Sequence, residues 1–413
     1  MAGPYSPSPP SRPSTRRPPR RLCARPSRWY VPPMAIRIVP HAAEWKDRVE
    51  AFNARMRDAG SNWGFYVDAE PSWIPKRRED QASWREYWLC VEDGETVRGG
   101  FALKPQKWLV RGREQLVTDW QGPFTEGAVD TRFAALAMRL VRDMLKKRPL
   151  LFSWGHGATD APMIQMVKTL SWLVMPTPVA MRVVNPYAFL RRNRILRVRP
   201  ERAAALDVLA MTGLGSLGIT GLHGLMRVGS GRLYRADYEE VPAFGPWADE
   251  LWERARHKYQ ALAVRNADAM NTLLPPGQTQ AEWSTPRRFR VRRAERTVGW
   301  VVTTCRKQQD DHRFGDLTVG CLVDYFADPD DAPYVIAAGF RALRNEGADV
   351  VFANQSDRRW LSAFRTTGFL LLEGRRLFCA APALKELLEP VSELEREGGL
   401  FLTNMDGHGP QGL

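Results

Sequence analysis

Two side chains that can accept a proton follow predicted strands in the first half of the chain. Asp119 stands near the end of a strand-like segment from Gln115 to Trp120, and His156 lies in the glycine-rich turn after the next such segment. A carboxylate or an imidazole at a strand end can act as a general base. Asp119 is the first candidate and His156 the second, and either side chain can also serve only as a local hydrogen-bonding partner.

The five cysteines give no sign of a metal centre. They are widely spaced, with no Cys-x-x-Cys pair and no histidine at zinc-ligand spacing. We therefore expect no metal cofactor and a reducing compartment. Cys305 and Cys321 lie in apolar, strand-like segments, where a thiol usually packs as a small hydrophobic side chain.

Charge is unevenly distributed along the chain. Its 413 residues carry 60 basic and 46 acidic side chains, for a net charge of +14. Residues 1–33 hold seven arginines, no acid and ten of the 31 prolines, which leaves a net charge of +7 for the rest. We expect these residues to form a disordered leader, because proline at this density prevents a regular helix. A surplus of this size does not by itself indicate a nucleic-acid partner.

No part of the sequence is a clear membrane-spanning segment. Such a helix needs about 18 uninterrupted apolar residues, and no stretch reaches that length. The sequence thus favours a cytoplasmic protein, with peripheral membrane contact left open.

Periodic apolar residues predict a first module within residues 34–190. Trp45, Val49, Phe52 and Met56 recur at helical spacing before Gly60. The dipeptide Asp93-Gly94 between two alternating segments predicts a β-hairpin. The other expected elements are strands at 107–110, 115–120, 150–154 and 179–184, a helix over 133–144 and a short helix over 160–172.

The same order of elements recurs within residues 241–390. A long helix is expected from Trp247 to Leu262, followed by strands at 289–293, 297–305 and 317–323, a helix over 332–345, a strand at 350–353 and a helix over 357–366. We therefore expect two modules side by side, each with a sheet of its own. Residues 391–413 are expected to form a flexible tail.

The linker between the modules, residues 191–240, is basic and then apolar. Six arginines fall between Arg191 and Arg202, and a glycine-interrupted apolar run follows to Met226. Basic flanks beside an apolar helix suit an anionic membrane surface. The alternative is a linker helix packed across the two modules with its arginines in water.

Several segments together resemble the GNAT acyltransferase superfamily. They are Val97-Arg-Gly-Gly-Phe-Ala-Leu-Lys104 and Leu150–Trp172 in the first module and Asn354–Phe369, ending in Gly-Phe, in the second. In particular, residues 34–382 resemble tandem-GNAT, Fem-like proteins of bacterial biosynthetic loci. The resemblance implies an α/β fold of two tandem GNAT-like modules, each a mixed sheet with helices on both faces.

The resemblance also implies acyl-CoA, most simply acetyl-CoA, as co-substrate. Its pantetheine would lie where two parallel strands separate, with its pyrophosphate at the next helix N-terminus. The residues implied in the first module are Trp120, Gln121, Gly122, Phe124, Thr125, Gly127 and Ala128. The equivalent loop of the second module has three aspartates and no glycine, so we expect the thioester only in the first.

For the acceptor, the aromatic and proline-containing segment 62–75 suggests Trp63 and Trp73 as contacts. The predicted function is acyl transfer from a thioester to a small-molecule amine of a cell-wall, polysaccharide or secondary-metabolite precursor. Two alternatives stay open: a Fem-like aminoacyl transferase that uses charged tRNA, and a non-catalytic scaffold.

Overall fold

The computed structural model describes residues 36–155, 161–228, 234–276, 285–391, 399–407 and 409–410. The predicted leader, residues 1–33, and His156 lie outside the described residues. The chain from Ile36 onward is a single unit.

Nine elements make up what we call the first half. In chain order they are β1 (Ile36–Pro40), α1 (Lys46–Asp58), β2 (Glu86–Glu92), β3 (Thr96–Val110), β4 (Arg113–Thr125), α2 (Leu136–Lys147), β5 (Leu151–Trp154), α3 (Pro162–Thr169) and β6 (Leu173–Val183). The predicted hairpin at Asp93-Gly94 is present, and β3 is one long strand where two were expected. Three linker helices follow: α4 (Pro186–Arg192), α5 (Pro200–Met211) and α6 (Leu214–Val228).

The second half repeats this order, with β8 and α8 inserted after its first helix and α11 and β14 added at its end. Its elements are β7 (Asp237–Glu240), α7 (Pro246–Ala255), β8 (Ala261–Ala263), α8 (Ala267–Leu273), β9 (Arg287–Arg293), β10 (Arg296–Lys307), β11 (Thr318–Ala327), α9 (Ala332–Asn345), β12 (Val350–Asn354), α10 (Arg358–Thr366), β13 (Leu370–Ala380), α11 (Pro382–Leu388) and β14 (Leu400–Phe401). The helix expected to reach Leu262 ends at Ala255, because Leu262 pairs with Leu109 of β3 as part of β8.

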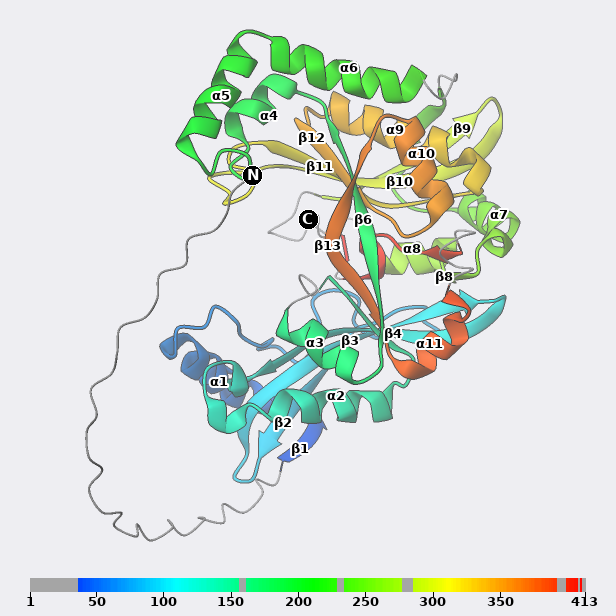
Figure 1. Ribbon diagram of the computed structural model, residues 1–413. Helices are drawn as coiled ribbons and strands as arrows, with labels where there is room; N and C mark the ends of the chain where they lie inside the picture. Colours follow the sequence, from blue (N-terminus) through cyan, green and yellow to red (C-terminus); the bar gives the residue numbers. More distant parts are fainter. Residues whose placement is uncertain are drawn as a thin grey trace, which may run out of the picture. The chain divides into compact units, whose positions relative to one another are not determined.

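The strands form one continuous mixed sheet, in the order β1-β2-β3-β4-β5-β13-β6-β12-β11-β10-β9-β7. The expectation of two separate sheets is therefore wrong. The last long strand of each half crosses to the other half: β13 pairs with β5, and β6 pairs with β12. Figure 1 shows these two long strands running side by side through the middle of the molecule. Backbone hydrogen bonding thus joins the halves directly.

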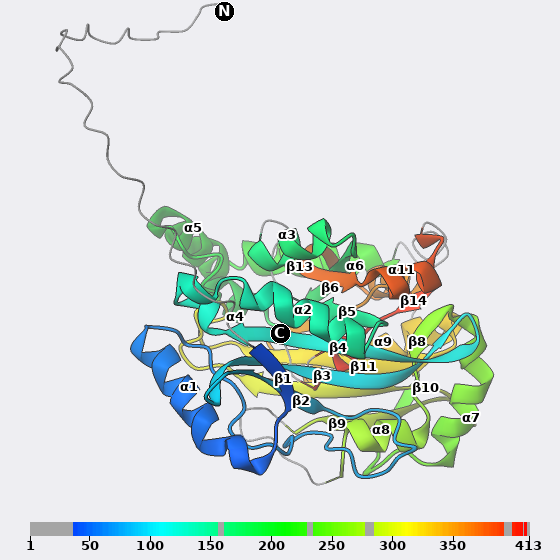
Figure 2. The same ribbon diagram turned by 90° about the horizontal axis from the view of Figure 1, so that it is seen from below.

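The predicted fold class, α/β with a mixed sheet and helices on both faces, is confirmed. In Figure 2, α2, α3 and α11 lie on one side of the strands and α1 on the other. Antiparallel pairs dominate among the described strands, and the parallel pairs there are β4 with β5, β11 with β12 and the short β14 with β8. The first two of these pairs each belong to one half, at equivalent points in the order of elements.

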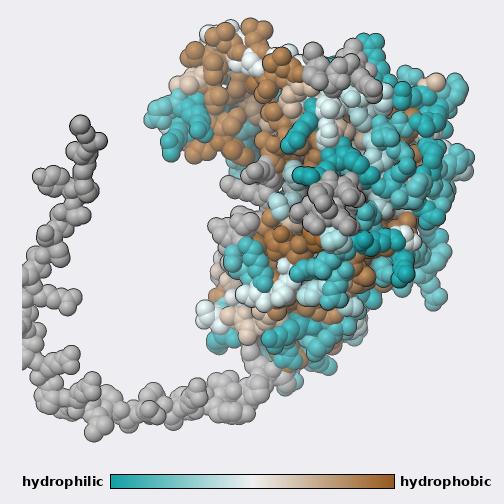
Figure 3. All heavy atoms as spheres, turned by 45° about the vertical axis from the view of Figure 1, so that its right-hand side comes forward, coloured by the Kyte–Doolittle hydropathy of each residue, from teal (hydrophilic) through white to brown (hydrophobic). Residues whose placement is uncertain are grey.

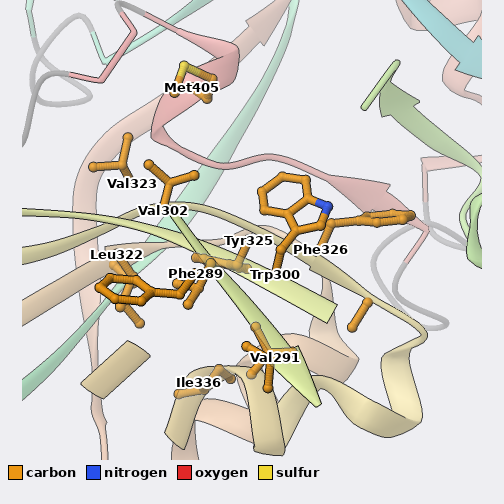
Figure 4. Close-up of a cluster of buried hydrophobic side chains, with 14 of the residues drawn as sticks. Phe289, Val291, Trp300, Val302, Leu322, Val323, Tyr325, Phe326, Ile336 and Met405 are labelled. Carbon is orange, nitrogen blue, oxygen red and sulfur yellow. The ribbon is translucent and has the colours of Figure 1, made fainter. Parts of the chain in front are cut away.

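Residues 399–407 and 409–410, which we call the C-terminal segment, are buried where a flexible tail was expected. Leu400, Leu402 and Met405 have almost no exposed surface. Figure 4 shows Met405 beside the core residues Val302 and Val323 of the second half. This segment therefore completes the core, and its polar groups must find partners inside the protein.

Candidate active site

The two parallel strands of the first half separate soon after they meet. β4 and β5 pair only at Thr118 with Leu151 and at Asp119 with Phe152. β4 then runs on to Thr125 along β3, with a bulge opposite Gly100 and Ala102. The edge of β4 that faces away from β3 thus has no strand partner among the described residues after Asp119, which leaves backbone groups for another chain or a ligand.

Asp119 lies at the point where the strands separate. Its side chain is fully buried. One carboxylate oxygen, Oδ2, accepts a hydrogen bond from the Gln121 amide at 3.1 Å, whereas Oδ1 has no hydrogen-bond partner among the described residues. A buried carboxylate oxygen without a donor is costly, so this atom is suited to a donor brought by a substrate.

Lys104 pairs with Asp119 across β3 and β4 and is also fully buried. Its ammonium group donates to the carbonyl oxygens of Met405, Asp406 and Gly407, each at 2.7 Å. Burial lowers the pKa of Lys104 to about 8, while the charges of Asp119 and Asp406 oppose this shift. Because all three ammonium protons are engaged, Lys104 holds the C-terminal segment in place and is not a free base.

The residues implied as thioester contacts occupy the end of β4 and the turn after it. Trp120 is buried beside Trp172, with ring centroids 5.9 Å apart. Gln121 joins Asp119 to Arg85, whose guanidinium donates to the Gln121 side-chain oxygen. The other five follow directly: Gly122, Phe124, Thr125, Gly127 and Ala128. The structure therefore brings Asp119 and these residues together on one stretch of chain.

Both acids of the predicted phosphate loop are neutralised. Glu126 is buried and accepts from Arg55 and, at 2.7 Å, from Arg98. Asp130 is paired with Arg132 at 2.6 Å, and this contact lowers the pKa of Asp130. The repulsion that these two carboxylates would exert on a phosphate is thereby reduced.

The helix after this loop offers its N-terminus without a side-chain cap. The N-cap residue of α2 is Ala135, which is exposed, and no side chain bonds to the first turn. The first turn also contains no acid. Its N–H groups and the positive end of the helix dipole are therefore available to an anion.

The equivalent separation in the second half is filled by side chains. β11 and β12 pair as far as Leu322 with Ala353. The Tyr325 hydroxyl of β11 then donates to the Asn354 carbonyl of β12 at 2.8 Å, which bridges the two strands. Phe401 of β14 packs within 6.1 Å of the Tyr325 ring and 5.6 Å of the Trp360 ring, centroid to centroid, between β11 and α10.

The loop of the second half has its aspartates engaged in hydrogen bonds and ion pairs. The Asp328 side chain accepts from the Asp330 backbone N–H, and Asp331 is held by Arg293 and Arg296. The Asp328 carboxylate thus caps the start of this loop, as the Asp130 carboxylate does in the first half by accepting from the Arg132 backbone N–H. The two loops therefore differ in their number of aspartates, and the second separation has the Tyr325 bridge and the Phe401 packing.

Asp324 of β11 is tied into the core by an ion pair. Its Oδ1 accepts from Arg265 at 3.3 Å and from the Thr403 hydroxyl at 2.7 Å. Burial raises the pKa of Asp324 to about 6 against the opposing effect of the Arg265 guanidinium. Asp324 stands two residues past the last pair between β11 and β12. In the first half, the residue two positions past the last pair between β4 and β5 is Gln121, so Asp324 is the counterpart of Gln121 and not of Asp119.

The two tryptophans proposed for the acceptor have different surroundings. Trp63 is 67% exposed and lies near Phe124, with ring centroids 6.1 Å apart. Trp73 is buried, donates to the Leu273 carbonyl and is covered by Gly409. Trp63 is thus accessible to a ligand beside the end of β4, whereas Trp73 has a structural environment.

Comparison with known proteins gives distant likenesses only. No protein-family model matches the chain, and no curated protein matches it. Among solved structures, it is similar to Saccharomyces cerevisiae N-myristoyltransferase with bound myristoyl-CoA and inhibitors, at 10% identity and a TM-score of 0.48 over 86% of this chain and 81% of the other.

Two bacterial structures give similar values. A GCN5-related N-acetyltransferase from Anabaena variabilis has 9% identity and a TM-score of 0.47, over 83% of this chain and 72% of the other. A probable N-acyltransferase from Enterococcus faecalis has 8% identity and a TM-score of 0.46, over 86% and 74%.

Several residues of this site could not be found from sequence. Lys104 belongs to a strand motif that indicates no role for its side chain. Arg85 and Asp406 lie far along the chain from their partners, Gln121 and Lys104, so no local pattern indicates them. No group of three potential metal ligands occurs among the described residues. Two hollows of about 580 and 560 Å³ lie near Arg77 and near Arg111, and neither is lined by residues of the strand separation.

Proposed function

We propose that the chain is an N-acyltransferase that binds acyl-CoA, or a similar thioester, in its first half and transfers the acyl group to an amine. The supporting observation is the difference between the two parallel strand pairs. β4 and β5 separate after Asp119 without a bridge among the described residues, whereas Tyr325 and Phe401 fill the second separation. β11 also runs on past its last pair with β12, but there Tyr325 and Phe401 cover the gap, so the first half is the better place for the amide groups of pantetheine.

The N-terminus of α2, which follows the free edge of β4, suits the diphosphate of a nucleotide-bearing donor. Its first turn has no acid and no side-chain cap, and Glu126 and Asp130 are paired with arginines. A pyrophosphate at this position would accept hydrogen bonds from backbone N–H groups and be favoured by the helix dipole. This arrangement agrees with the resemblance to acyltransferases.

In the proposed reaction the acceptor nitrogen attacks the thioester carbonyl carbon. A C–N bond forms, the C–S bond breaks, and CoA leaves as a thiolate that takes up a proton. Asp119 accepts the proton that the amine loses, because its Oδ1 is buried and lacks a donor. Gln121 orients this carboxylate through the bond to Oδ2.

The acceptor is proposed to be an amine of a cell-wall, polysaccharide or secondary-metabolite precursor. Trp63 and Phe124 offer a partly exposed aromatic surface beside the end of β4, of the kind that packs against a sugar or another bulky ring. Arg85, which donates to Gln121 and to the Tyr66 hydroxyl, would read polar groups of the same acceptor.

The test is calorimetric titration of the protein with acyl-CoA thioesters of increasing chain length. Ala135→Asp places a carboxylate at the N-cap of α2, where it repels phosphate but stabilises the helix. We expect affinity to fall about tenfold or more while thermal stability stays equal or rises. Asp330→Ala removes one acid from the loop of the second half and is the matched control, with unchanged affinity expected.

Other results of these titrations would contradict the proposed site or the proposed function. Equal affinity in Ala135→Asp and wild type would remove α2 from the site, and a rise in affinity in Asp330→Ala would move the site to the second half. Absence of binding to every thioester would leave the scaffold interpretation. Salt-sensitive binding of charged tRNA with no thioester binding would support aminoacyl transfer.

A further inference from the structure

Large hydrophobic side chains are exposed on the linker helices. Of fifteen such side chains among the described residues, ten fall between Tyr187 and Leu225. Met211, Leu217 and Leu225 are each more than 70% exposed. Figure 3 shows apolar side chains gathered at one end of the molecule, where α4, α5 and α6 lie. A contiguous apolar surface of this kind usually has a partner.

The outward face of α6 is apolar and its inward face is anchored. Leu214, Leu217 and Leu225 fall on one helical stripe and point outward. On the opposite side, the His223 ring is buried, donating from Nδ1 to the Gly368 carbonyl at 2.7 Å and accepting from the Val183 N–H at 3.3 Å. The inward face of α6, with His223 and the partly buried Ile219, thus packs on the protein, and the leucines of the outward face stay exposed.

The positive charge of the chain is concentrated beside these helices. Residues 191–235 contain nine arginines and two acids, Glu201 and Asp207. Residues 34–413 contain 53 basic and 46 acidic side chains, so the rest of them carry 44 of each sign and are neutral. In the sequence, the net charge of +7 of residues 34–413 therefore falls within the segment that holds the apolar helices.

Part of this charge is not compensated by acids. Arg191 and Arg197 share Asp207, and Arg194 is paired with Asp310. Arg192, Arg199 and Arg202 are exposed, and none of the three forms an ion pair within the described part of the chain. An anionic surface would supply the missing partners.

We propose that α5, α6 and the flanking arginines dock the protein on the surface of an anionic lipid bilayer. The exposed leucines, Val208 and Met211 would enter the interface, while the arginines would contact phosphate headgroups. No single described helix is long and apolar enough to cross a membrane. Among the described residues, one pair of consecutive helices reaches that length and apolarity together, Pro200–Met211 with Leu214–Arg227, but the two helices are bent by 78°. The bend and the inward anchor of His223 therefore favour a position along the surface.

A second copy of the chain is the less suitable occupant. A symmetric dimer through this surface would bring two copies of the same arginine-rich segment together, and like charges would oppose the contact. A bilayer with acidic headgroups offers apolar and anionic groups at the same depth as the leucines and arginines. Charge complementarity thus decides between the two.

The experiment is cosedimentation of the full chain with vesicles of phosphatidylcholine, with and without phosphatidylglycerol. We expect at least about tenfold tighter partitioning to the anionic vesicles, decreasing with salt. The triple variant Leu214→Ser, Leu217→Ser, Leu225→Ser should lose about tenfold or more, because it removes apolar area from the interface. All variants keep residues 1–33, so the arginines of that segment contribute equally to each.

The contribution of the arginines to vesicle binding is tested by a second set of variants and a matched control. Arg192→Gln, Arg199→Gln, Arg202→Gln should reduce anionic partitioning about tenfold or more. The control, Arg57→Gln, Arg113→Gln, Arg142→Gln, loses the same charge at exposed positions outside the linker and should bind within about twofold of wild type. Circular dichroism and thermal melting verify that every variant is folded.

Three results would overturn the proposal. They are no vesicle binding by wild type, equal binding by the leucine variant, and equal loss in the two arginine triples. A dimer seen by sedimentation equilibrium and broken by the leucine variant, with no vesicle binding, would assign the surface to a second copy. None of these readouts depends on acyl transfer, so docking and the proposed function can fail independently.

Discussion

The two strand separations of this protein have the same place in the order of elements but different contents. In the first half, β4 leaves β5 after Asp119, and a loop with paired acids leads to an uncapped helix. In the second half, Tyr325 bridges the strands, Phe401 fills the gap and Asp328 occupies the loop. The same geometry thus carries a bridging tyrosine and a packed phenylalanine in one half, and a buried aspartate beside two tryptophans in the other.

The C-terminal segment links these two states. Phe401 fills the second separation, and the next residues run past Arg265 to Lys104, which pairs with Asp119 in the first half. The ion pairs at its centre are fully buried, so breaking one partner leaves a charge uncompensated. The C-terminal segment that carries Phe401 in the second half therefore also holds Lys104, the strand partner of Asp119, in the first half.

The largest effect is expected from removing the aromatic filling. Phe401→Ala should destabilise the protein by about 3–5 kcal/mol, because a fully buried phenylalanine leaves a cavity when it is truncated. Phe124→Ala, at the partly exposed end of β4, should cost about half as much or less. Urea unfolding of both variants measures the difference, and equal losses would contradict the distinction between a filled and an open separation.

The next effect concerns turnover at the two buried aspartates. Asp119→Asn should slow acyl transfer about a hundredfold with little change in thioester affinity, because only the proton acceptor is lost. Asp324→Asn should reduce stability through Arg265 but leave the rate constant of transfer near that of wild type. Steady-state kinetics of both variants decide the matter, and unchanged turnover in Asp119→Asn would exclude it from the mechanism.

A smaller effect is expected in the pH dependence of stability. Burial raises the folded-state pKa of Asp324 to about 6, above its ordinary value near 3.8. The stabilisation that this gives is present below about pH 4 and is lost as the pH rises through about 6. Relative to Asp324→Asn, wild type should therefore lose on the order of 2 kcal/mol between pH 4 and pH 7. Parallel curves from urea unfolding across this range would show that the group stays ionised.

Local elements were predictable because their signals lie within a few residues. The apolar spacing that predicted a helix over residues 332–345 gave the bounds of α9, and Asp93-Gly94 marked the β2–β3 turn. The predicted helix up to Leu262 was wrong because β8 pairs with β3, more than 150 residues earlier. A tertiary contact there outweighs local periodicity.

The candidate site was predictable in part. Asp119 and the end of β4 form one stretch of chain, so a motif could indicate them together. Arg85 and Lys104 were missed as partners of this stretch, since their contacts depend on which strands become neighbours. Trp73 was expected at the acceptor but packs against Leu273 and Gly409, both distant in sequence.

The sequence alone determined the repeated order of strands and helices, the acidic loop of the second half and the concentration of arginines in the linker, because each is a property of adjacent residues. Only the tertiary structure decided that β6 and β13 exchange halves, that Glu126 is neutralised and that Phe401 closes one separation. Buried backbone and charged groups must find partners wherever the fold brings them. Those partners come from segments that are distant in the sequence, so the spacing of residues along the chain does not predict them.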